Sequence, residues 1–156
     1  MRYVLKMILI AALFTAVNLS LSYCEELQID QIVDQFKAAT DVQRMELKEL
    51  YKDREVLGVG IVDNVRDYNT FDEVNDIERN YYQIISTVEK TPKGNSYKVI
   101  FLYKNLNKVK NIDKGQLIER NASILRIIDD RLWISVWLYE GEFTEEEKAQ
   151  FRYQWE

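Results

Sequence analysis

Apolar and polar side chains alternate with a period of two along most of the chain after residue 54, as in strands with one buried face. Turn-forming residues separate these stretches, and residues 91–95 contain a proline followed closely by a glycine. The pattern predicts five strands, with a hairpin between the second and the third: residues 55–66, 81–89, 96–104, 116–128 and 131–139.

Before the first strand the period changes to that of an α-helix. The apolar residues at 29, 32, 33 and 36 are spaced at i, i+3, i+4 and i+7, which predicts a helix with one apolar face. Thr40 and Gln43 have the spacing of a capping box, so the helical region is expected to break at Thr40 and to restart. The second segment ends near Asp53, and the helical region is expected to pack across one end of a sheet.

Three further segments connect or follow the strands. Residues 67–80 are rich in Asp, Asn and Glu and are expected to form a solvated loop. Residues 105–112 have enough apolar residues at helical spacing for a short helix, and Asp129-Asp130 is expected to be a tight turn. Residues 141–156 contain a second capping box, which begins at Thr144, and are expected to form an acidic tail or a short helix.

Gly58 and Gly60 lie two residues apart in the first strand and therefore on the same face. Each glycine lowers the packing and raises the entropic cost of a strand, so such a pair indicates a bend or a close backbone approach. A strongly coiled first strand is what a small closed barrel needs in order to turn its corner.

The order of these elements resembles that of the OB-fold, a five-stranded Greek-key barrel with a helix between the third and fourth strands. Residues 30–140 look like a group of exported bacterial proteins that are similar to the tRNA-anticodon-binding-like OB proteins, which have a leading helix before the barrel. The resemblance implies a mainly β, OB-like binding module with no catalytic residues to carry over. Three motifs carry it: Thr40-x-x-Gln43-Arg44, Tyr51-Lys52-Asp53-Arg54-Glu55-Val56 and Gly58-x-Gly60-x-Val62-x-x-Val65. The alternative is a cystatin-like α+β fold, a helix laid across an antiparallel meander, which would not need the segment 105–112.

The first residues have the features of a secretory signal peptide, predicted over residues 1–22. Arg2 and Lys6 precede an apolar run, and Ser20-Leu21-Ser22 has the form of a small-x-small cleavage site. Cleavage is expected after Ser22 or Cys24, which leaves residues 23–140 as helix plus barrel, with no transmembrane helix. Cys24 is the single cysteine, and the residues before it resemble a lipobox, from which Tyr23 departs. The localisation expected is periplasmic or secreted, with a lipid anchor through Cys24 as the alternative.

Charge bears on the kind of partner. The net charge of −5 becomes −7 without residues 1–24, which contain two basic and no acidic side chains. Such a chain is repelled on average by phosphate backbones and anionic membranes. The partner expected is therefore a protein or another component of the cell envelope, and nucleic acid is the less favoured alternative.

Candidate binding residues lie in the predicted hairpin and in the last strand. Seven lysines between residues 90 and 114, in the hairpin and the short helix, have aromatic residues interleaved among them, a combination used in sequence-tolerant binding of single strands or other anionic polymers. Two tryptophans share one face of the last strand, which is either covered by a helix or by the C-terminal tail, or is a binding surface. The predicted ligand-binding residues are Tyr97, Lys98, Phe101, Tyr103, Lys104, Trp133 and Trp137. Inward packing of Phe101 and its neighbours in the barrel core, with lysines on a solvated edge, is the structural alternative.

Catalysis and metal binding have little support in the sequence. The chain has no histidine, no Gly-rich phosphate loop and no cysteine after Cys24, so only a carboxylate pair could act. Asp67 and Asn69 resemble the start of a calcium loop, but Phe71 stands at the third ligand position. A non-catalytic protein without a cofactor is therefore predicted.

Overall fold

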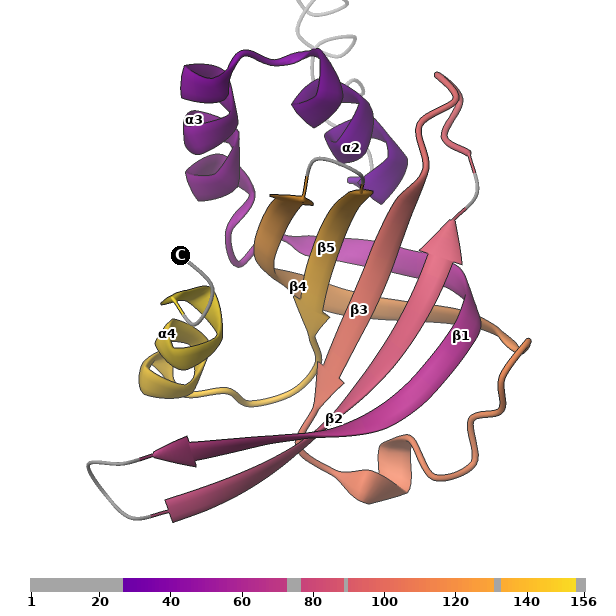
Figure 1. Ribbon diagram of the computed structural model, residues 1–156, viewed down its shortest axis with the longest axis vertical. Helices are drawn as coiled ribbons and strands as arrows, with labels where there is room; N and C mark the ends of the chain where they lie inside the picture. Colours follow the sequence, from indigo (N-terminus) through magenta and orange to yellow (C-terminus); the bar gives the residue numbers. More distant parts are fainter. Residues whose placement is uncertain (1–26, 73–76, 89, 131–132, 154–156) are drawn as a thin grey trace, which may run out of the picture.

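The computed structural model describes residues 27–72, 77–88, 90–130 and 133–153 (Figure 1). Helices α2 and α3 precede the strands, a 3₁₀ turn η1 lies between β3 and β4, and helix α4 follows β5 (Figure 1). Their bounds are α2 Ile29–Ala38, α3 Asp41–Tyr51, β1 Glu55–Asp72, β2 Ile77–Val88, β3 Tyr97–Tyr103, η1 Leu106–Lys108, β4 Leu117–Asp130, β5 Trp133–Tyr139 and α4 Glu145–Tyr153.

The five strands form a closed barrel in the order β1-β2-β3-β5-β4. Strand β1 pairs with β4 through its first half and with β2 through its second half, and both pairings are antiparallel. Strands β3 and β5 are parallel neighbours and close the barrel. This order and these directions are those of an OB-fold, which confirms the predicted fold class. The cystatin-like alternative is wrong, because an antiparallel meander would not close through a parallel pair.

Gly58 and Gly60 lie at crowded positions in the wall of the barrel. A Cβ atom on Gly58 would stand 2.6 Å from both Leu138 Cδ1 and Phe101 Cζ, inside the barrel. A Cβ atom on Gly60 would stand 2.7 Å from Ser86 Cβ on β2. Neither position has room for a side chain, so the glycines allow β1 to approach the interior, as the sequence predicted.

Helix α2 closes one end of the barrel, and its hydrogen bonds extend to the hairpin between β2 and β3. Ile32, Val33 and Phe36 are fully buried in the barrel core. On the same helix, the carboxylate of Asp34 accepts hydrogen bonds from Thr91 Oγ1 at 2.5 Å and from Asn95 Nδ2 at 2.7 Å. A buried carboxylate needs such donors, and these two hold the hairpin turn against the helix.

Helix α3 begins with the predicted capping box. Gln43 N donates to Thr40 Oγ1, and Thr40 N donates to Gln43 Oε1, so two backbone donors at the helix start are satisfied. Within α3 itself, Tyr51 is the buried residue, and Val42 and Met45 are about 70 % exposed. The helical region was expected to pack across one end of the sheet, and α2 is the helix that does so.

The largest difference from the sequence prediction concerns the acidic segment 67–80. Its described parts continue β1 to Asp72 and begin β2 at Ile77, so they form a two-stranded ribbon that projects from the barrel near α4 (Figure 1). Cross-strand pairing has overridden the polar composition. Asp129-Asp130, predicted as a turn, are the last two residues of β4, and the predicted short helix is the 3₁₀ turn η1.

The N-terminal predictions lie outside the described residues, including the signal peptide 1–22 and the lipidation of Cys24. In the part of the chain that the structure describes, no helix is long and apolar enough to cross a membrane.

Candidate binding face

Helix α4 covers part of the outer face of the barrel and forms a second hydrophobic core there. Phe151 is fully buried, and its ring meets that of Tyr81 edge-on at 4.7 Å between centroids. Trp137 and Tyr139 of β5 belong to the same cluster. The C-terminal segment therefore covers Trp137, which is 7 % exposed. It leaves Trp133 on the surface, with 39 % of that residue exposed.

Asp53, at the junction of α3 and β1, attaches α4 to the barrel. It has a φ of 58°, a left-handed conformation that Asp tolerates better than most residues. Its carboxylate accepts hydrogen bonds from Tyr139 Oη at 2.8 Å and from Arg152 Nη2 at 2.8 and 2.9 Å, and Lys148 Nζ lies 3.3 Å away. Burial alone would raise the pKa of Asp53, but these donors and positive charges outweigh it and hold the pKa below its usual value.

The alternating residues of β3 separate onto opposite faces. Tyr97, Phe101 and Tyr103 are buried inside the barrel. The side chains of Lys98 and Lys104 lie on the outer face, because neighbouring residues of a strand point to opposite sides. The aromatic and basic residues predicted as one binding surface are therefore not brought together within β3. The three aromatic residues instead pack inward in the barrel core, as the structural alternative expected.

The outer lysines of β3 contact aromatic rings from other elements instead. Lys98 Nζ lies 5.2 Å from the ring centroid of Trp133 on β5. Lys104 Nζ lies 4.9 Å from that of Phe143 and 2.6 Å from Glu147 Oε2. A carboxylate thus neutralises Lys104, whereas Lys98 has no ion pair with a described residue.

Two neighbouring rows of side chains cross the outer face where α4 ends. In the first row, Thr87, Lys98, Ser135 and Ile128 are successive cross-strand partners on β2, β3, β5 and β4, and Trp133 lies two residues from Ser135 on the same face. None of these side chains is buried. We refer to these five residues as the open face. The second row consists of Ile85, Ile100, Trp137 and Arg126.

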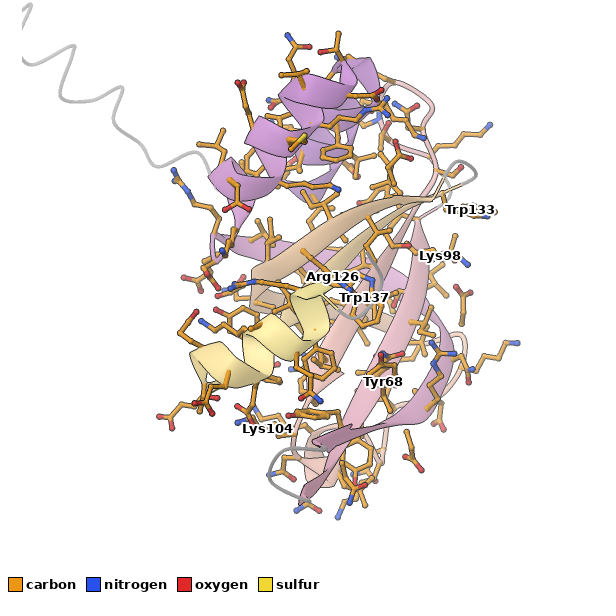
Figure 2. All side chains as sticks on the ribbon, turned by 60° about the vertical axis from the view of Figure 1, so that its left-hand side comes forward. Tyr68, Lys98, Lys104, Arg126, Trp133 and Trp137 are labelled. Atoms are coloured by element: carbon orange, nitrogen blue, oxygen red, sulfur yellow. The ribbon has the colours of Figure 1, made fainter. Side chains whose placement is uncertain are left out.

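Arg126 lies at the end of the second row and stacks on its cross-strand partner. Its Cζ atom lies 4.2 Å from the ring centroid of Trp137, and the Tyr68 ring meets the Trp137 ring edge-on at 6.3 Å (Figure 2). Burial lowers the pKa of Arg126 to about 10, and Tyr68 opposes this effect, so the guanidinium remains charged at neutral pH. Arg126 forms no ion pair with a described residue.

Sequence reasoning missed Arg126. The available signal was a single cation within the apolar run from Ser123 to Ile128. The β-bulge between Ile124 and Arg126 shifts the strand register by one residue, which no local pattern indicated.

Other parts of the surface bring fewer polar and aromatic side chains together. Two open hollows of about 530 and 580 Å³ flank α3. The first contains the ion pair of Arg44 and Asp129, at 2.8 Å, and the second is lined in part by Leu47 and Leu50. Among the described residues, no group of three or more acidic, Cys or His side chains could hold a metal ion.

No protein-family model and no curated protein matches the chain. Among solved structures, the chain is similar to the mitochondrial single-stranded DNA-binding protein Rim1 from S. cerevisiae, with 15 % sequence identity and a TM-score of 0.31. The match covers 57 % of this chain and 90 % of that chain. The order of the strands establishes the OB topology independently of this likeness.

Proposed function

We propose that this chain is an exported, non-catalytic binding module that engages a protein or envelope partner through the open face of its OB-like barrel. OB-folds bind their ligands on the face of the second and third strands. Here α4 covers one part of the outer face, and the other part presents Trp133, 39 % exposed, next to Lys98. The exposure of Trp133 carries the proposal, because a large aromatic side chain beside a cation is typical of interface centres.

The charge of the molecule favours a protein partner over a nucleic acid. The chain has a net charge of −5, and two lysines beyond the end of β3 are paired with carboxylates, Lys104 with Glu147 and Lys108 with Glu140. A single strand needs successive cations along its backbone and aromatic platforms for its bases. Lys98 next to Trp133 supplies one such unit, so binding of single strands or another anionic polymer is the second candidate.

Site-specific photo-crosslinking tests the proposal. A photoreactive residue at Ser135, within the open face, should give a discrete adduct with an envelope protein, and Trp133→Ala should remove that adduct. The same photoreactive residue at Glu119, an exposed position on the part of β4 that pairs with β1, is the matched control and should give none. Equal adducts from both positions, or no adduct from Ser135, would count against the open face.

Titration with labelled single strands at low and moderate salt separates the two candidates. A protein-binding module should show no salt-sensitive binding of oligonucleotides, whereas phosphate recognition weakens steeply as salt rises. Salt-sensitive binding that is lost in Lys98→Gln would favour the second candidate.

Export is a separate part of the proposal and is supported by the sequence of residues 1–22. It predicts that the protein recovered from its host begins at Tyr23 or Glu25. An intact mass with a diacylglyceryl group on Cys24 would instead establish a lipid anchor.

A further inference from the structure

Three side chains in the described outer face have hydrogen-bond donors that are buried and without a partner. They are Nε and Nη2 of Arg126, Nε1 of Trp137 and Nε2 of Gln83. Trp137 and Gln83 are both more than nine-tenths buried. Every one of these atoms is a donor, so the unsatisfied groups share one requirement, which is an acceptor.

Arg126 and Trp137 are adjacent and lie next to the open face. Arg126 is the cross-strand partner of Trp137, and Ile128, two residues further along β4, belongs to the open face. Figure 2 shows Arg126 and Trp137 between Lys98 and Tyr68, beside α4. The donor pair thus borders the open face, but its donor atoms are buried. A ligand on the open face would reach them after side-chain rotations of the kind that are common on binding.

A partly buried guanidinium without a counter-ion is unfavourable for folding. Aromatic stacking offsets only part of that cost. Residues kept at a cost to stability are concentrated at functional sites.

We propose that Arg126 and the indole N–H of Trp137 form a receptor for a carboxylate of the partner, so that the partner presents an Asp or Glu side chain at the edge of the open face. This inference rests on the proposed function and names the chemistry of the partner. A planar guanidinium binds a carboxylate through two parallel N–H···O bonds, and the indole adds a third donor.

A carboxylate fits better than the phosphates of a nucleic acid. The receptor and the open face together offer two cations, Arg126 and Lys98, whereas a polyanion places a charge on every nucleotide. An acidic side chain places a single charge there, and the rest of the partner contacts Trp133 and Ile128.

The test uses ¹⁵N-labelled protein, purified after processing of its own N-terminal segment. N–H signals of the indoles are assigned with Trp133→Phe and Trp137→Phe, and that of the guanidinium with Arg126→Met. The probes are N-acetyl-glutamate amide, a short polyglutamate peptide, inorganic phosphate and an oligothymidylate, each added at constant ionic strength.

We expect the two glutamate probes to shift the Trp137 and Arg126 signals saturably, and Arg126→Met to abolish the Trp137 shift. Arg54→Met is the matched control, since Arg54 is exposed, and it should leave the shift unchanged. Saturable shifts with phosphate and oligothymidylate but not with glutamate would overturn the carboxylate assignment. Absence of any saturable shift, or equal shifts in Arg126→Met, would overturn the receptor.

A second readout distinguishes an interaction role from a structural one. Arg126→Met keeps a long side chain and removes an unpaired charge, so its urea midpoint should equal or exceed that of the parent protein. The same variant should weaken binding of the polyglutamate peptide by about tenfold or more, as for loss of charge-assisted hydrogen bonds. A lower midpoint with unchanged binding of that peptide would assign Arg126 a structural role.

The two proposals fail separately. If the photoreactive residue at Ser135 still gives its adduct but no anion shifts the Trp137 signal, the open face binds a partner without this receptor. If glutamate shifts that signal but no adduct forms, the receptor exists and the open face is not the partner surface.

Discussion

Replacing Gly60 with valine tests whether barrel closure depends on the missing side chain. A Cβ atom at this position would stand 2.7 Å from Ser86 Cβ. Because carbon atoms are in optimal contact at about 3.5–4.0 Å, β1 and β2 would have to separate by about 1 Å. Ser86 is fully buried, and its Cβ is part of the rigid base of the side chain, so it cannot rotate away.

Two effects of opposite sign determine how much Gly60→Val changes the free energy of unfolding. Strand propensity and the lower entropy of the unfolded chain favour valine by up to about 1 kcal/mol. Overpacking in a closed barrel costs about 1–3 kcal/mol, and the two valine methyl groups place this site at the upper end. We therefore expect a net loss of about 2 kcal/mol, which lowers the urea midpoint by about 1 M at an m-value of about 2 kcal/mol/M.

Equilibrium urea unfolding is the assay, and a double-mutant cycle identifies the contact. Glu119→Val, on the exposed face of β4, raises strand propensity without crowding and should not lower the midpoint. Ser86→Gly combined with Gly60→Val should recover about 1 kcal/mol relative to additivity, since it removes the clashing atom. A midpoint for Gly60→Val equal to or above that of the parent, at unchanged slope, would refute the steric reasoning.

Two other predictions concern carboxylates that join elements. Burial alone would raise the pKa of Asp34, but hydrogen bonds from Thr91 and Asn95 hold it below the usual value. This stabilisation is therefore present above about pH 4, the unfolded value, and is lost as pH falls through the folded pKa. Asp34→Ala should lower the free energy of unfolding by about 1.5–3 kcal/mol at pH 7, the range for hydrogen bonds to a charged group, and should make it depend less on pH in the acid range. An unchanged pH dependence of the urea midpoint in that range would contradict this. Asp53→Asn keeps a residue that tolerates its φ of 58° but removes the charge that Arg152 contacts. Amide exchange in α4 should then accelerate on the order of tenfold while strand amides keep their rates, and equal protection of α4 in both proteins would rule out this anchor.

The sequence by itself determined the features that depend on neighbouring residues. A period of two predicted the five strands, and the spacings Thr40 to Gln43 and Thr144 to Glu147 predicted helix starts that their hydrogen bonds confirm. Gly58 and Gly60 indicated close approach in the first strand, which the crowding at both positions confirms. Capping, turns and alternation are encoded within a few residues, so they can be inferred without knowing what lies across the barrel.

Tertiary structure alone decided which side of each strand is interior and which cations are paired. The sequence grouped Lys98 and Phe101 in one candidate binding surface, whereas closure through the parallel β3–β5 pair placed Phe101 inside the barrel and Lys98 beside Trp133. The projecting ribbon of β1 and β2 and the bulge before Arg126 depend on pairing between distant residues. The physical reason is that burial and cross-strand pairing are properties of the assembled barrel, in which residues far apart in sequence determine each other's surroundings.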